Sequence, residues 1–201
     1  LGVGLPLGTF GHTAGGLLVP MAVALPTASV PPLPPIAPAR TVYHAIVGTG
    51  EEVVRLPVLE FQCRRRRNDS TWLGIRLPGI DRAAWLRSLG AVTVRLYAGD
   101  GVTMGEFLRA TLTDVAEEQS VWSATTTLTC RAAGPADAFQ TRELAGVEKI
   151  VIDNGRRFVR CNQVDFRLRP GDFAVAAGET FLVYGVSYRV GATLAIMDVR
   201  E

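Results

Sequence analysis

The distribution of apolar and polar positions divides the chain into two unlike parts. Residues 1–39 contain no charged side chain and hold eight of the twelve prolines, whereas from residue 41 onward short apolar runs alternate with turn residues. Short runs rich in β-branched residues are typical of strands, and clustered prolines favour an extended path. The pattern therefore predicts an all-β, mainly antiparallel body behind an extended N-terminal arm over residues 1–39.

A β-rich domain with one short helix is predicted over residues 40–131. The turn at 48–50 would join the first two strands into a hairpin. The helix is expected near residues 81–89, because Asp81 is a candidate N-cap and Gly90 a candidate end. The predicted strands are 41–47, 53–61, 72–77, 91–97, 107–115 and 121–131.

A second small β-barrel domain is predicted over residues 147–201, after a linker over residues 132–146. Two turn signals support it: Asn154-Gly155 is a hairpin dipeptide, and Pro170-Gly171 fits the central positions of a type II turn. The expected fold class is thus two small barrel- or sandwich-like modules. The strands predicted in this second module are 147–152, 158–161, 172–176, 180–190 and 192–199.

The predicted arm is apolar as well as uncharged. Its most apolar run, residues 17–25, is interrupted by Pro20 and is much shorter than the roughly twenty residues of a membrane-spanning helix, so no membrane insertion is expected. A tail that stays in water is normally polar or charged. Three arrangements of the arm stay open: it packs on a neighbouring subunit, it packs on its own domain, or it is disordered. We favour the first. The side chains expected at this interface are Leu5, Leu7, Phe10, Leu17, Leu18, Val19, Met21, Leu25, Leu33 and Ile36.

Arginine dominates the basic residues. The net charge is +2, and Lys149 is the single lysine among twenty-one basic side chains. GC-rich coding or a need for guanidinium ion pairs at interfaces would each produce this bias. The sharpest feature is the run Arg64-Arg65-Arg66-Arg67, whose side chains would point to alternate faces if a strand continues through it. Solvated or inter-subunit ion pairing, a basic rim or lumen near passing DNA, and true nucleic-acid binding all stay open.

The cysteines do not form a recognisable metal or disulfide pattern. Cys63, Cys130 and Cys161 are odd in number, far apart in the chain and without a CxxC pair. Zinc sites and secreted disulfide frameworks both need closely spaced or evenly paired cysteines. Each cysteine adjoins predicted strand residues, which favours reduced thiols in the core.

Candidate catalytic residues are equally sparse. His12 lies in the arm and His44 in a predicted strand, and no nucleophile motif accompanies either of them. Paired carboxylates could support glycoside cleavage. The adjacent glutamates at 51–52 and 117–118 are interpreted as solvated loops. We therefore expect no cofactor, no metal and no enzymatic activity.

A set of strand and turn motifs carries a family resemblance over about residues 30–201. It consists of VVRLPVLEFQ at 53–62 with the following arginines, WLGIRLPG at 72–79, RATLTDV at 109–115, FVRC at 158–161 and LRPGD at 168–172. In these segments the chain resembles tail-tip or baseplate structural proteins of siphophages, in particular the Mu-like transposable siphophages of Pseudomonas.

The resemblance implies a virion component made in the host cytoplasm. It would assemble with copies of itself as a trimer or hexamer around the tail axis, as a hub or ring component, in contact with other tail proteins and weakly with passing DNA. One alternative is a carbohydrate- or receptor-binding accessory module, which would need exposed aromatics; Trp72, Trp85 and Trp122 are instead predicted in the core. A cell-wall hydrolase would need a nucleophile set that the sequence lacks.

Overall fold

The structure is a computed structural model, and one compact unit, Pro38–Glu201, contains all the residues that it describes. The predicted arm over residues 1–39, with its apolar interface side chains, lies outside them, as do His12 and Glu51. The described residues are 41–49, 52–99, 104–134 and 139–201.

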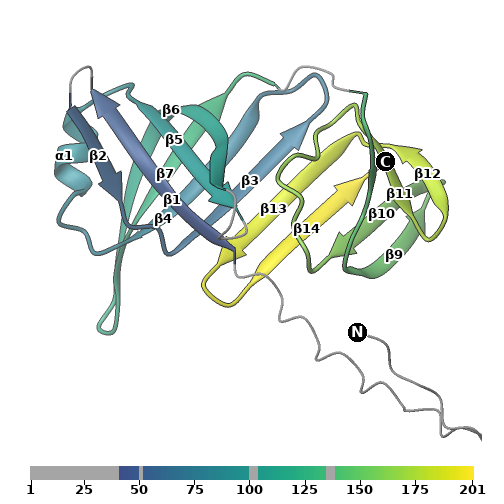
Figure 1. The fold of residues 1–201 in the computed structure, drawn as a ribbon. Coiled ribbons are helices and arrows are strands. Elements are labelled where there is room, and N and C mark those ends of the chain that lie inside the picture. The colour runs from purple at the N-terminus through teal and green to yellow at the C-terminus, as the bar shows by residue number, and fades with distance from the viewer. Residues whose placement is uncertain (1–40, 50–51, 100–103, 135–138) are drawn as a thin grey trace, which may run out of the picture. The chain divides into compact units, whose positions relative to one another are not determined.

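Strands make up most of the described residues and one short helix accompanies them (Figure 1), which confirms the all-β fold class. In chain order the elements are β1 (Val42–Thr49), β2 (Glu52–Leu56), β3 (Glu60–Arg66), β4 (Thr71–Pro78), α1 (Ala83–Ser88), β5 (Thr93–Gly99), β6 (Met104–Gln119), β7 (Ala124–Ala132), β8 (Thr141–Glu143), β9 (Val147–Asp153), β10 (Arg156–Cys161), β11 (Phe173–Ala176), β12 (Glu179–Leu182), β13 (Gly185–Gly191) and β14 (Ala195–Arg200).

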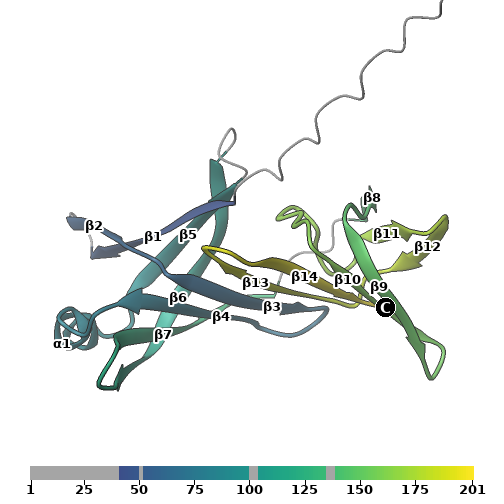
Figure 2. The ribbon, with the colours of Figure 1, turned by 90° about the horizontal axis from the view of Figure 1, so that it is seen from below.

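Eleven strands form one sheet in the order β2-β1-β5-β6-β7-β4-β3-β13-β14-β10-β9, and three form a second in the order β12-β11-β8. Neighbouring strands are antiparallel except β11 and β8, so the mainly antiparallel character is confirmed. Within the large sheet, β3 pairs with β13, a strand that is far from it in the sequence. This pairing places Cys63 opposite Tyr188. Figure 2 shows these two strands side by side from a second direction.

Strands of both predicted domains therefore belong to a single sheet. The predicted linker over residues 132–146 contains a strand of its own, β8, which pairs with β11 in the smaller sheet. The division into domains over 40–131 and 147–201 stays a prediction, and so does a barrel form for each of them.

The core is built from alternate strand residues and an aromatic cluster. In β3 every second side chain is buried, as the period of a strand requires. Phe61, Phe107, Phe166 and Tyr188 contact one another with ring centroids 5.1–6.2 Å apart. The buried hydroxyl of Tyr188 donates a 2.7 Å hydrogen bond to the carbonyl oxygen of Leu168, so its polar atom does not go unpaired.

Both predicted turns are confirmed. Asn154 and Gly155 have φ values of 49° and 73°, the left-handed pair that a tight hairpin needs, and they join β9 to β10. In the second turn the backbone N–H of Asp172 donates to the carbonyl of Arg169 at 3.1 Å. Gly171 has a φ of 94° there, a conformation that glycine adopts without a steric penalty.

The helix is confirmed, but its predicted cap is wrong. The N-cap of α1 is Arg82, which makes no side-chain capping bond. Asp81 precedes it in a turn closed by a 3.0 Å hydrogen bond from the Ala83 N–H to the Ile80 carbonyl. Because this bond already satisfies the backbone N–H of Ala83, the first residue of the helix, that N–H does not need the Asp81 carboxylate as a cap. Gly90, with a φ of 65°, follows the helix end as expected.

Other sequence interpretations are wrong as well. The predicted strand 53–61 is two strands, β2 and β3, which are not neighbours in the large sheet, and the predicted strand 192–199 begins only at Ala195 in β14. The predicted strand 121–131 begins too early, since β7 starts at Ala124 and the residues before it form the β6–β7 turn. The predicted strand 180–190 is two strands, β12 and β13, in different sheets. The glutamates at 117–118 lie within β6, where Arg87 and Arg76 pair with them, and not in a solvated loop.

Candidate functional site

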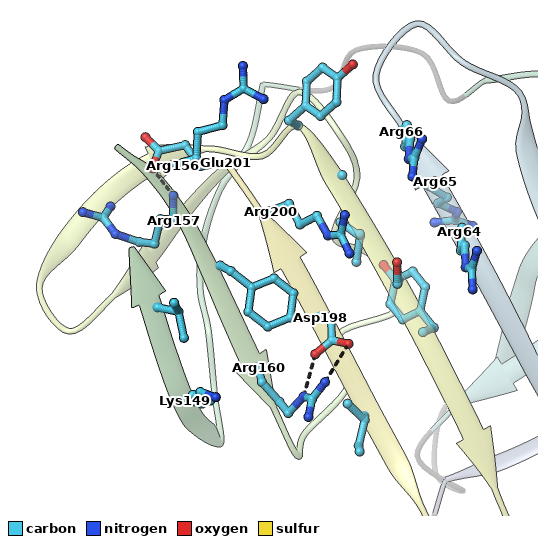
Figure 3. A pocket seen from close by; sticks show the side chains of 18 of the residues that line it. Arg64, Arg65, Arg66, Lys149, Arg156, Arg157, Arg160, Asp198, Arg200 and Glu201 are labelled. Atoms are coloured by element: carbon cyan, nitrogen blue, oxygen red, sulfur yellow. Dashed lines mark hydrogen bonds and ion pairs between the residues drawn. The ribbon is translucent and has the colours of Figure 1, made fainter. Parts of the chain in front are cut away.

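A hollow of about 1160 Å³ lies over β3, β13, β14, β10 and β9, and basic side chains are the largest group among those that line it (Figure 3). We call it the basic groove. Nine basic and three acidic residues line it, an excess of six positive charges. The charged lining residues are Arg64, Arg65, Arg66, Lys149, Arg156, Arg157, Arg160, Arg189 and Arg200 with Asp153, Asp198 and Glu201.

Strand register brings these residues together from distant parts of the chain. Side chains at paired positions on neighbouring strands lie on the same face of a sheet. Two such rows cross the floor of the groove from β3 to β9. The first row is Arg64, Ser187, Asp198, Arg160 and Lys149, and the second is Arg66, Gly185, Arg200, Phe158 and Val151.

One ion pair in the groove is satisfied internally. Asp198 accepts hydrogen bonds of 2.8 and 3.3 Å from the guanidinium of Arg160. The hydrogen bond to this carboxylate raises the pKa of Arg160. Asp198 therefore neutralises the charge of Arg160. The excess of positive charge in the groove comes from the other basic residues that line it.

Two of the lining arginines turn away from the open face. Arg65 is only 5% exposed, and its guanidinium donates to the Phe107 carbonyl at 2.7 Å while lying over the Phe107 ring. Arg157 pairs with Glu179 and lies over the ring of Phe181. The run of arginines in β3 thus alternates, with Arg64 and Arg66 exposed on one face and Arg65 buried on the other.

Aromatic side chains lie between the exposed arginines. The guanidinium carbon of Arg64 lies 5.4 Å from the ring centroid of Trp72, and that of Arg200 lies 5.7 Å from that of Phe158. Gly74 leaves room for the indole, because a Cβ there would come within 2.6 Å of the Trp72 ring. Sequence patterns do not indicate this interleaving, because the four residues come from four different strands.

The basic surface continues beyond the groove. A second, smaller hollow of about 290 Å³ shares Arg64 and Arg66 with it and adds Arg131 from β7, together with Asp69 and Ser70. Trp72 of β4 lines this second hollow too. The two hollows adjoin through the shared arginines, which extends the basic lining onto two more strands.

The tip of the β6–β7 hairpin carries two exposed apolar side chains, and the hairpin extends from the sheet in Figure 1. Val121 is 89% exposed and Trp122 is 94% exposed. The Ser120 hydroxyl accepts hydrogen bonds from the backbone N–H groups of Trp122 at 3.3 Å and Ser123 at 3.0 Å, which fixes the turn. The prediction of Trp122 in the core is wrong, because the alternating pattern runs on through the turn.

The other two tryptophans are half-buried. Trp85 packs against the core from α1. Trp72 lies across β4 beneath Arg64, as described above.

The described histidine and cysteines have environments that suit structural residues. His44 stacks on Tyr97 with ring centroids 5.1 Å apart, and burial, with a further contribution from Arg55, lowers its pKa. All three cysteines are free and buried, which confirms the predicted core thiols. Burial raises the pKa of Cys63 and Cys161 to about 11 and that of Cys130 to about 12. Thiols with such pKa values are poor nucleophiles at neutral pH.

Two further findings hold for the part of the chain that the structure describes. Its His, Cys, Asp and Glu side chains nowhere gather in a group of three or more that could hold a metal ion. Its helix lacks the length and apolarity that crossing a membrane requires.

Solved structures share this fold, although no family model and no curated protein matches the chain. The tail protein of Neisseria meningitidis MC58 is 8% identical, with a TM-score of 0.53 over 80% of this chain and 96% of that one. The E. coli c3393 protein is 9% identical, with a TM-score of 0.51 over 77% and 75% of the two chains. It is described as a component of the type VI secretion system with structural similarity to the T4 bacteriophage tail proteins gp27 and gp5. These likenesses show a shared fold.

Proposed function

We propose that the chain is a structural subunit of a bacteriophage tail tip or baseplate, with no enzymatic activity of its own. The observation that carries the proposal is the fold, which extends over 96% of the Neisseria tail protein. The description of the E. coli protein supports the same class of assembly. Within that class, the sequence motifs favour a virion protein of Mu-like siphophages, placed as a hub or ring component in three or six copies around the tail axis.

The hairpin tip is suited to a contact with a neighbouring subunit. Tryptophan is enriched among the residues that dominate binding energy at interfaces, because it buries a large area at a low entropic cost. Val121 and Trp122 expose such an area, on a turn that the Ser120 hydroxyl already fixes. A preformed tip loses little conformational freedom on binding.

The two edges of the large sheet offer further contacts. Unpaired edge strands present backbone donors and acceptors to other chains. On edge strand β2 Val53 is 66% exposed, and on edge strand β9 Ile150 and Ile152 are 37% and 65% exposed. A ring of subunits would cover these apolar side chains, and a rotation that closes on itself would limit the number of copies. The apolar arm over residues 1–39 would clasp an adjacent subunit.

A carbohydrate- or receptor-binding accessory module is the second candidate. The exposure of Trp122 favours it, because sugar rings commonly pack against exposed aromatic rings. Around the tip, however, the neighbouring side chains are Val121 and two serines that bond to each other. A glycan array with the full chain separates the two candidates, since only the second expects saturable sugar binding.

Sedimentation velocity on the full chain, alone and co-expressed with the proteins encoded beside it, tests the proposal. We expect a closed oligomer or a defined complex with another structural protein. A chain that stays monomeric and binds none of these proteins would refute the proposal. Deletion of residues 1–38 tests the arm separately: an unchanged oligomer mass would show that the arm does not join subunits.

A further inference from the structure

The basic groove has more positive charge than the protein itself neutralises. Asp198 is already paired with Arg160, while Arg64 and Arg200 contact only aromatic rings among the interactions found in the described residues. Like charges gathered on one face repel one another, and the repulsion is relieved when an anion binds. The groove is therefore suited to an anion with many charges.

The lining distinguishes between two kinds of polyanion. The centre of a protein–protein interface is typically depleted of charged residues and rich in apolar ones. The groove differs from such a centre in its charge, since nine basic residues line it. Its apolar and aromatic lining residues are Val151, Phe158, Tyr184, Val186, Tyr188 and Ile196. Exposed guanidiniums without internal partners are typical of surfaces that contact phosphates, where binding gains free energy from the release of counterions.

The aromatic residues indicate how a nucleic acid would be held. Proteins that bind unpaired bases offer them free aromatic faces for stacking. Here Arg64 covers one face of Trp72 and Gly74 lies under the indole, while Arg200 lies over Phe158. These two rings hold the guanidiniums in place, so that Arg64 and Arg200 lie between the rings and a ligand on that side. Tyr184 also lines the groove and is 52% exposed.

We propose that the basic groove binds the phosphate backbone of nucleic acid without sequence preference, through arginines that the aromatic rings hold in position. Contact with phosphates alone makes duplex DNA, with its higher charge density, at least as good a ligand as a single strand. The inference rests on the charge and geometry of the groove, and holds whether or not the chain is a tail subunit.

Fluorescence anisotropy with a labelled 30-base-pair duplex of random sequence tests the proposal on the full chain. We expect binding at 50 mM salt that weakens steeply as salt rises, and the same affinity for a second unrelated sequence. The variant Arg64→Ala/Arg66→Ala/Arg200→Ala should bind about tenfold more weakly or worse. Its slope of log affinity against log salt should fall by roughly 2–3, since each lost phosphate contact removes about 0.9.

The matched control removes the same charge elsewhere. Arg55, Arg82 and Arg167 are exposed and do not line the groove, so the variant Arg55→Ala/Arg82→Ala/Arg167→Ala should keep most of the affinity. Equal losses in both triple variants would show that only net charge matters and would overturn the proposal. So would the absence of duplex binding at 50 mM salt.

A competitor separates nucleic acid from an acidic protein surface. Poly-glutamate with the same number of charges as the duplex should displace it poorly. If poly-glutamate binds as tightly as DNA, the groove belongs to an acidic polypeptide and the proposal is wrong. Far-ultraviolet circular dichroism of each variant, unchanged from the parent chain, ensures that folded proteins are compared.

Discussion

The guanidinium carbon of Arg65 lies 4.1 Å from the ring centroid of Phe107, and its Nη2 donates a 2.7 Å hydrogen bond to the Phe107 carbonyl oxygen. This pair joins β3 to β6, which are not neighbours in the sheet. The run of arginines that begins at Arg64 thus contains both buried and exposed side chains. Arg65 stabilises the core, whereas Arg64 and Arg66 are exposed over the basic groove.

Replacement of Arg65 should destabilise the fold. In Arg65→Ala the Phe107 carbonyl loses its donor and the ring loses its cation, so we expect the free energy of unfolding to fall by about 2–4 kcal/mol. Urea denaturation measures it. Arg66→Ala, the control on the exposed face, should change it by less than about 0.5 kcal/mol. Equal effects of the two substitutions would show that Arg65 has no special structural role.

Replacement of Trp122 should weaken assembly and leave the stability of the fold unchanged. The indole is 94% exposed, so Trp122→Ala should leave the melting temperature unchanged while weakening the oligomer or complex seen by sedimentation velocity. Trp85→Ala provides the contrast, because Trp85 packs on the core and its loss should cost about 2–3 kcal/mol of stability. An unaltered sedimentation profile for Trp122→Ala would remove the hairpin tip from the proposed interface.

Stability should decline in alkaline solution. The pKa of Cys130 is about 12 in the fold, and an exposed thiol in the unfolded chain ionises near its ordinary pKa of 9. Between these values the folded state binds the proton that the unfolded state has lost. The free energy of unfolding therefore falls as pH rises, by about 1.4 kcal/mol per pH unit for each such thiol.

Cys63 and Cys161 act in the same direction, with pKa values of about 11. Urea denaturation from pH 8 to 10.5 should reveal the decline, and Cys130→Ala should make it shallower by the share of one thiol. A free energy that stays constant over this range would contradict the burial of the three thiols.

The buried carboxylate of Asp172 should be needed in its charged form. It is 0% exposed and accepts hydrogen bonds from the backbone N–H groups of Gln140 at 3.0 Å and Arg169 at 2.9 Å, one on each oxygen. Asp172→Asn turns one oxygen into a donor that faces another donor, which should cost about 2–3 kcal/mol in thermal or urea unfolding. Asp153→Asn, in the exposed β9–β10 hairpin, should be close to neutral; a similar loss there would point to a general charge effect.

The sequence predicts those parts of the fold that depend on short-range chemistry. The period of two and the β-branched runs indicate strands, and Asn154-Gly155 specifies its hairpin because both residues tolerate positive φ. Pattern alone misplaces elements where it continues through a turn. Trp122 fits the alternation of β7 yet lies at the tip before it.

Short-range sequence patterns do not reveal the basic groove. Its cations come from five strands, and the contact between β3 and β13 joins residues more than a hundred positions apart. The sequence does single out the arginine run at 64–67. Which of its members face the groove depends on the register of the sheet, and a shift of one residue would exchange Arg65 with its neighbours.

Cryo-EM of particles purified from cells that produce the tagged full chain tests the central claim most directly. The account predicts density for the fold of residues 41–201 at the tip of a tail, repeated around the tail axis in three or six copies. Particles that contain no copy of the chain, with the tagged protein recovered as a free monomer from the same cells, would contradict it.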